Sequence, residues 1–121
     1  MSKTNCFLEI DYFSGRPNPK LSISQEDFTA CYDEIYRLER AEARALFDGL
    51  GFRGFILSGP AAILFIQKTI IRIADNGIEY RKNNQAILAG LFALIRKYDR
   101  ENDYKPIVEA IKAEYLDQGM K

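Results

Sequence analysis

The hydrophobic pattern of this chain changes its period along the sequence, and this change limits the fold more than any other feature. Residues 6–13, CFLEIDYF, alternate between two faces with the period of two that is typical of a β-strand. Residues 83–98 instead repeat their apolar positions every three or four residues, as an amphipathic helix does. Because 121 residues suffice for one hydrophobic core, we expect a single α+β domain over residues 1–121.

The segment after the first strand carries clear turn and helix-start signals. Residues 14–20 hold one glycine and two prolines, which end the strand, and a short second strand is expected at residues 21–23. Ser24 has the character of a helix N-cap and is followed by acidic residues. This pattern predicts a long helix that ends at Gly49 and bends near Arg40.

The rest of the chain predicts more strands and then two helices. Residues 52–57 and 63–73 are rich in β-branched and aromatic residues and are expected to form strands, followed by a hairpin. Two helices complete the chain, the second with Pro106 in its first turn. The predicted order is ββαβββαα: a single sheet of about five mostly antiparallel strands, packed on one face by three helices.

The hairpin allows two registers. A turn at residues 76–77 alone places Arg72 opposite Arg81, and like charges in that position cost energy. A turn at residues 74–77 places Arg72 opposite Glu79. We expect the four-residue loop because it pairs unlike charges.

The composition excludes several classes of function. Histidine is absent, so the commonest general base and the commonest zinc ligand are missing. Seventeen Lys and Arg balance seventeen Asp and Glu, which gives no global charge to favour nucleic acid or an anionic membrane. The most apolar window, residues 61–73, is too short to span a bilayer. We expect no catalytic residue, no metal, no cofactor and no membrane or nucleic-acid partner.

The two cysteines, Cys6 and Cys31, have no metal-site spacing. The N-terminal residues lack a basic segment followed by an uninterrupted apolar stretch, so we expect a cytoplasmic protein rather than a secreted one. Buried free thiols are therefore expected rather than a disulfide.

The glycines of residues 49–54 match the letters of the dinucleotide-binding pattern GxGxxG. That pattern binds a pyrophosphate only where it leaves a strand and opens a helix. Here the predicted order is reversed, so we interpret the glycines as a helix stop and a tight connection.

Charged residues on the predicted strands have a functional and a plain interpretation. Glu9 and Asp11 share one strand face about 7 Å apart, a separation found in acid/base carboxylate pairs. A solvated or salt-bridged sheet face produces the same pattern far more often. A basic stripe on the outer hairpin face is interrupted by Glu79 and is also interpreted as a solvated face. The residues of this stripe are Lys68, Arg72 and Arg81.

The connection at residues 13–19, FSGRPNP, is the most unusual stretch, because two prolines stiffen it and present Arg16 as a forked cation. With Asn18 and Arg53 it could bind an anion. This site requires the strands at 6–13 and 52–57 to be antiparallel neighbours, so that the two guanidinium groups converge within about 8 Å. The alternative is a connector in which Arg16 packs on an aromatic ring or pairs with an acid.

FSGRPNP at residues 13–19, together with GFRGF at residues 51–55, resembles a group of small uncharacterised proteins that carry FSGRPNP after the first strand and G-[YF]-R-G-F after the first helix. The resemblance implies that Arg16 and Arg53 are motif positions of that group, and it carries no activity. The group often has an aromatic residue where this chain has Leu21.

These exclusions favour a non-catalytic binding module for a macromolecular partner, such as an inhibitor, immunity or accessory protein. The alternative is a binder of an anionic small molecule or a peptide carboxylate through residues 14–19 and 51–54. Eight phenylalanines and seven tyrosines also favour exposed aromatic surface, so we expect a protein partner and consider a homodimer.

Overall fold

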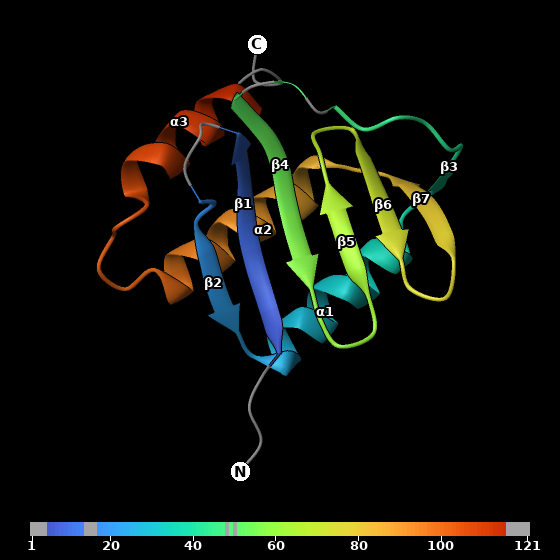
Figure 1. Ribbon diagram of the computed structural model, residues 1–121, viewed down its shortest axis with the longest axis horizontal. Helices are drawn as coiled ribbons and strands as arrows, with labels where there is room; N and C mark the ends of the chain where they lie inside the picture. Colours follow the sequence, from blue (N-terminus) through green and yellow to red (C-terminus); the bar gives the residue numbers. More distant parts are fainter. Residues whose placement is uncertain (1–4, 14–16, 48, 50, 116–121) are drawn as a thin grey trace.

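The computed structural model describes residues 5–13, 17–47, 49 and 51–115. Within these ranges the chain forms three helices and one antiparallel sheet of seven strands, in the order β2-β1-β4-β5-β6-β7-β3. In Figure 1 the sheet faces the viewer, and α1 and α2 pass behind it. The α+β class is confirmed, and the expected number of about five strands is wrong. The elements are β1 (Cys6–Phe13), β2 (Lys20–Ile23), α1 (Gln25–Tyr36), β3 (Arg40–Ala41), β4 (Gly51–Ser58), β5 (Ile63–Ile66), β6 (Ile70–Ala74), β7 (Ile78–Lys82), α2 (Gln85–Tyr98) and α3 (Lys105–Tyr115).

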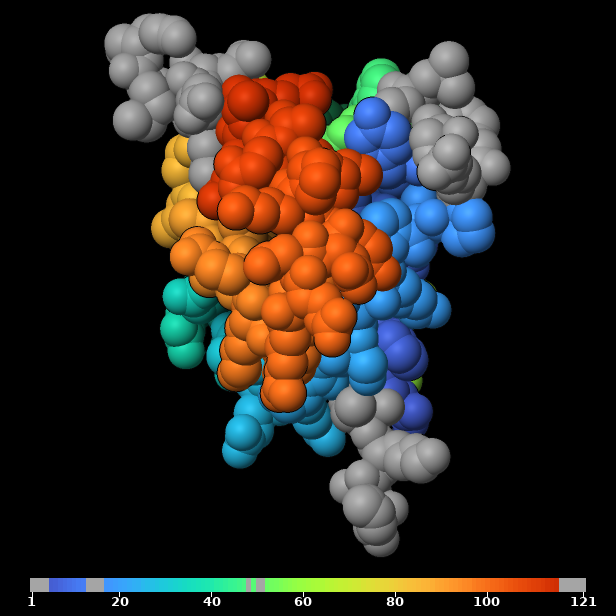
Figure 2. All heavy atoms as spheres, turned by 90° about the vertical axis from the view of Figure 1, so that its left-hand side faces the viewer, coloured from blue at the N-terminus to red at the C-terminus, as the bar shows by residue number. Residues whose placement is uncertain are grey.

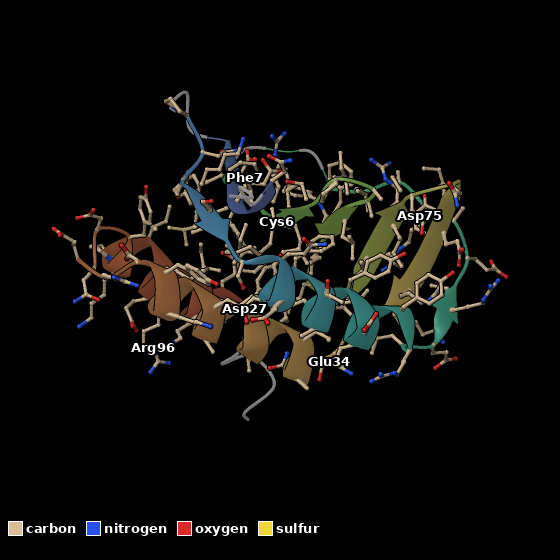
Figure 3. The ribbon with its side chains drawn as sticks, turned by 90° about the horizontal axis from the view of Figure 1, so that it is seen from below. Cys6, Phe7, Asp27, Glu34, Asp75 and Arg96 are labelled. Carbon is tan, nitrogen blue, oxygen red and sulfur yellow. The ribbon has the colours of Figure 1, made fainter. Side chains whose placement is uncertain are left out.

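The core lies between the sheet and the helices. The alternation of β1 places Cys6, Leu8 and Ile10 on the helix side, where each is 1% exposed. Their neighbour Phe7 points away from the helices (Figure 3). Seen from the β2 edge, α3 and the end of α2 form one side of the molecule and the first two strands the other (Figure 2).

Aromatic contacts join α2 and α3 to the sheet. The ring of Phe55 in β4 lies edge-on to Phe92 of α2, with centroids 5.5 Å apart. Phe52 meets Tyr115 of α3 in the same way at 4.8 Å. Such edge-to-face pairs add about 0.5–1.5 kcal/mol to the burial of the rings.

The first helix begins as predicted but ends early. The Ser24 side chain accepts a hydrogen bond from the Asp27 amide at 3.0 Å, which confirms the N-cap. The helix ends at Tyr36 instead of Gly49. Arg40 pairs with Arg81 across β3 and β7, so pairing at the sheet edge replaces the helical bonds that the local sequence favours.

The predicted strand at residues 63–73 is divided into β5 and β6. The division lies at residues 67–69, where the Gln67 amide donates to the Ile70 carbonyl at 2.9 Å and closes a tight turn. Residues 67–69 contain no glycine or proline, so the sequence has no local signal for this turn. Together, β3 and the divided segment account for the two additional strands.

The hairpin register differs from the prediction by one residue. Arg72 pairs with Tyr80 instead of Glu79, and Ala74 pairs with Ile78, which leaves a three-residue loop. A one-residue shift of β7 moves each of its side chains to the opposite sheet face. Arg81 therefore lies on the helix side, 2% exposed, so it forms no stripe with Arg72 and the expectation of a solvated Arg81 is wrong.

Candidate functional site

The two motif stretches meet at one end of the sheet. Strands β1 and β4 are antiparallel neighbours, and Phe13 at the end of β1 pairs with Gly51 at the start of β4. This is the strand arrangement that the anion-site hypothesis requires. Arg16 lies outside the described residues, and Asn18 and Arg53 lie within them.

Gly54 explains the second motif stretch. The β1–β4 register shifts between Asp11 and Tyr12, because Asp11 pairs with Gly54 and Tyr12 with Phe52. Gly54 has φ +135°, and a Cβ there would lie 2.3 Å from the Ile66 carbonyl oxygen. Only glycine fits such a bulge without strain.

The bulge determines where Arg53 points. In a regular strand, residues three apart face opposite sides. Here Phe52 and Phe55 are both buried, with ring centroids 5.3 Å apart, while Arg53 between them reaches Asp11 on the other face. The motif glycine Gly54 therefore has a role in a strand. The interpretation of residues 49–54 as a helix stop is wrong, since α1 ends at Tyr36 and the described element before β4 is the strand β3.

Asp11 and Asn18 link the two motifs. Arg53 Nη2 lies 2.9 Å from Asp11 Oδ1, and Arg53 Nε donates to the same oxygen at 3.3 Å. Asn18 Nδ2 donates to Glu9 at 2.7 Å, and Asn18 Oδ1 accepts from the Tyr12 amide at 3.0 Å. These hydrogen bonds join Asn18, which follows the 14–16 connection, to β1, which precedes it. Asp11 is held in a salt bridge with Arg53.

The Asp11–Arg53 pair is the first candidate site. The second candidate site is the sheet face that the described helices leave uncovered, here called the open face. Its members are the residues of β2, β1, β4, β5, β6 and β7 whose side chains point away from the helices. Two rows of them cross the sheet and are connected residue by residue by the strand registers, and the Asp11–Arg53 pair lies on the same face beyond the first row. The first row is Lys20, Glu9, Ile56, Phe65, Arg72 and Tyr80, and the second is Ser22, Phe7, Ser58, Ile63, Ala74 and Ile78.

The open face is apolar at its centre. An antiparallel sheet that faces water normally carries polar residues on that side. Here Ile63 is 41% and Ile78 57% exposed, and Ile56 and Phe65 are half-buried beside them. Sequence reasoning missed these residues, although the unbroken apolar run at 63–66 signals a strand with apolar side chains on both faces.

Arg72 is the exceptional charge on this face. Its guanidinium carbon lies 4.7 Å from the centre of the Phe65 ring. In the described part of the chain Arg72 forms no ion pair, and its Nε is buried without a hydrogen-bond partner. Arg72 and Arg53 also line a shared groove of about 410 Å³, bordered by Phe47.

The groups with shifted pKa values lie away from the open face. Hydrogen bonds from Lys97 and Tyr98 lower the pKa of Asp27, which joins α1 to α2. Burial raises the pKa of the Cys31 thiol to about 11, so this thiol is neutral at physiological pH. Cys6 and Cys31 form no disulfide, as expected, but only Cys6 is buried, because Cys31 is partly exposed.

Comparisons with protein-family models, curated proteins and solved structures found no match to this chain. Among the described residues, no helix is long and apolar enough to cross a membrane. The assignment of function therefore depends on the geometry of the open face and of the Asp11–Arg53 pair.

Proposed function

We propose that this protein is a non-catalytic binding module that binds another protein through the open face, in the manner of an inhibitor, immunity or accessory protein. The observation that carries the proposal is the apolar centre of a sheet face that none of the helices in the described part of the chain covers (Figure 1). Exposed apolar patches with polar rims mark protein interaction sites.

The energetics support a protein partner rather than water as the neighbour of this face. Covering apolar surface contributes about 25 cal/mol per Å². Ile63 and Ile78 lie in one row and Phe65 in the next, so a single flat partner surface would cover them together. Arg72, stacked on Phe65, adds a cation that is already oriented.

The test is site-specific photocrosslinking in the cells from which the sequence comes. A photoreactive phenylalanine replaces Ile63, and in a matched control it replaces the exposed Ala93 of α2. We expect a discrete adduct at position 63 that disappears when Ile56→Asp is added, and no adduct at position 93.

The proposal fails if position 63 forms no adduct, or if its adducts persist unchanged in the Ile56→Asp variant. Circular dichroism of each variant confirms that the fold is intact. Ile56 is half-buried on the open face, so its replacement leaves the core side of the sheet unchanged.

A second candidate function is the binding of an anionic small molecule or a peptide carboxylate. It is favoured by the pairing of Phe13 with Gly51, which brings the two motif connections to one end of the sheet. The groove that Arg53 and Arg72 line would take the anion, which would have to compete with Asp11 for the Arg53 guanidinium. Isothermal titration with citrate as the probe should then show binding that Arg53→Lys weakens at least tenfold, because an ammonium lacks the guanidinium fork. An absence of heat with the unmodified chain would exclude this function for citrate-like anions, and Arg96→Lys serves as the control.

A further inference from the structure

We propose that the partner of the open face is a second copy of this chain, bound face to face about a two-fold axis that runs parallel to the strands between Ile56 and Phe65. This inference rests on the proposed function, because it names the occupant of the same surface. It follows from the order of residues in the two rows.

The first row has an order that complements itself. It runs Lys20, Glu9, Ile56, Phe65, Arg72, Tyr80 through five successive cross-strand pairs. A two-fold axis at the centre of this row exchanges its two halves. Glu9 then faces Arg72 of the second copy, Ile56 faces its Phe65, and Lys20 faces its Tyr80. Unlike charges meet, apolar groups meet, and a cation meets an aromatic ring.

The second row agrees with the same axis. It runs Ser22, Phe7, Ser58, Ile63, Ala74, Ile78 through the corresponding pairs. Phe7 then faces Ala74 of the second copy, so a large side chain meets a small one. The remaining pairs of this row contain no charge and place no like charges together.

Two of the three charged residues of the first row, Glu9 and Arg72, have no counterion among the residues that the structure describes. Arg72 forms no ion pair among the described residues, and its Nε is buried without a hydrogen-bond partner. Glu9 is bonded to the neutral amide of Asn18, and no ion pair of Glu9 occurs in the described ranges. The symmetric pair places Glu9 of each copy opposite the Arg72 guanidinium of the other copy, so that each of these charges gains a counterion.

The geometry of stacked sheets permits these contacts. Sheets that pack face to face are about 10 Å apart and rotated by about 30°. Glu9 and Arg72 each lie one and a half strand spacings, roughly 7 Å, from the axis. A rotation of that size displaces them sideways by about 4 Å, which a long arginine side chain can span.

An axis perpendicular to the strands gives a worse arrangement. Along the first row it would place Glu9 opposite Glu9 and Arg72 opposite Arg72 of the second copy, so like charges would meet. Midway between the rows it would place Glu9 opposite Phe7 and Arg72 opposite Ala74, so neither charge would gain a counterion. The charges therefore select the parallel axis.

The open face predicts a weak pair. Six strands span roughly 24 Å, and two rows of side chains cover roughly 14 Å along the strands. This footprint of about 340 Å² per copy is well below the roughly 800 Å² per partner of standard stable complexes. We therefore expect a dissociation constant on the order of 100 µM.

Sedimentation equilibrium with charge-exchanged variants tests the inference. The unmodified chain should shift from monomer to dimer between about 10 µM and 1 mM, around the affinity expected from the interface size. Glu9→Arg and Arg72→Glu should each weaken the dimer at least tenfold. An equimolar mixture of the two variants should restore it, because the arginine introduced at position 9 of one chain then faces the glutamate introduced at position 72 of the other, while the native pair forms at the second position. Arg96→Glu on α2 should leave the dimer unchanged, and thermal melts verify that each variant folds.

Two results would overturn the inference: a chain that remains monomeric at 1 mM, or a mixture that dimerises no better than the single variants. If the chain is monomeric but the Ile63 adduct with another protein still depends on Ile56, the second copy is excluded and the proposed function stands. If that adduct is also absent, both proposals fail.

Discussion

Arg72 lies over the ring of Phe65, its cross-strand neighbour, with 4.7 Å between the guanidinium carbon and the ring centre. Both side chains lie on the open face, and a core of buried aliphatic residues occupies the other side of the same strands. Stacking holds the cation in place, while its Nε has no hydrogen-bond partner in the described part of the chain. The open face therefore carries a cation that is held in one orientation beside an aromatic ring.

Neighbouring residues of β5 should respond oppositely to the same substitution. Ile63→Lys should change the free energy of unfolding by no more than about 0.5 kcal/mol, because the side chain is 41% exposed on the open face. Leu64→Lys should destabilise the fold by more than about 4 kcal/mol, because it buries an unpaired ammonium at a position that is 0% exposed. Urea denaturation of monomeric protein measures both. Equal losses in the two variants would show that the open face is part of the core.

Gly54→Ala should destabilise the protein by about 2–4 kcal/mol, because alanine would have to adopt φ +135° against the Ile66 carbonyl. The matched control is Gly77→Ala, since a Cβ at Gly77 has no atom within 4 Å. Chemical denaturation of the two variants measures the difference. A Gly54→Ala variant as stable as the control would contradict the role given to the bulge.

Tyr98→Phe should cost about 1–2 kcal/mol of unfolding free energy, because the hydroxyl donates to Asp27 and accepts from the Ser24 amide. These bonds connect the end of α2 to the start of α1. Tyr80→Phe is the control, since no hydrogen bond of the Tyr80 hydroxyl occurs among the described residues. Denaturation curves that coincide for the two variants would mean that the connection is not stabilising.

The protein should lose stability above pH 10. A hydrogen bond to Asp75 raises the pKa of Tyr32 to about 12, and burial raises the pKa of Tyr115 to about 12. A raised pKa in the folded state gives stability that is complete below the ordinary value of 10.0 and is lost as the pH rises towards 12. The melting temperature, followed by circular dichroism from pH 8 to 12, should fall in this window. Tyr32→Phe should reduce the fall, and an equal fall in both proteins would refute the assignment.

The sequence predicted correctly those helices and strands that are determined by residues close to one another in the chain. Ser24 caps α1, and the alternation of residues 6–13 forms β1. The apolar stripe from Ile87 to Ile95 is the buried face of α2. In each case the residues that define the element lie within a few positions of one another.

The errors arise where distant segments pair. Residues 37–47 have helical spacing of apolar residues. However, the Lys82 amide donates to the Glu39 carbonyl, and Arg40 and Ala41 pair with the edge of β7 to form β3. In the hairpin loop, the Asp75 carboxylate accepts a hydrogen bond at 2.8 Å from Tyr32 of α1, which lies 43 residues earlier in the chain. Neither contact has a signal in the sequence near it.

The candidate site shows the same limit. The motifs identified Asn18 and Arg53 as special, and both contact the Glu9–Asp11 face. Arg72 was identified only as a member of a basic stripe. Its place beside Phe65 depends on the turn at residues 67–69, which divides the predicted strand into β5 and β6 and pairs Phe65 with Arg72.

Isotope-filtered NMR tests the central claim most directly. A 1:1 mixture of carbon-13-labelled and unlabelled chains, at a concentration where sedimentation detects the dimer, reports only contacts between copies. We predict nuclear Overhauser effects between the Ile56 methyl groups of one copy and the Phe65 ring protons of the other, with none from the exposed residues of α2. Contacts between copies that map to the helices, or none between Ile56 and Phe65, would contradict the face-to-face pair.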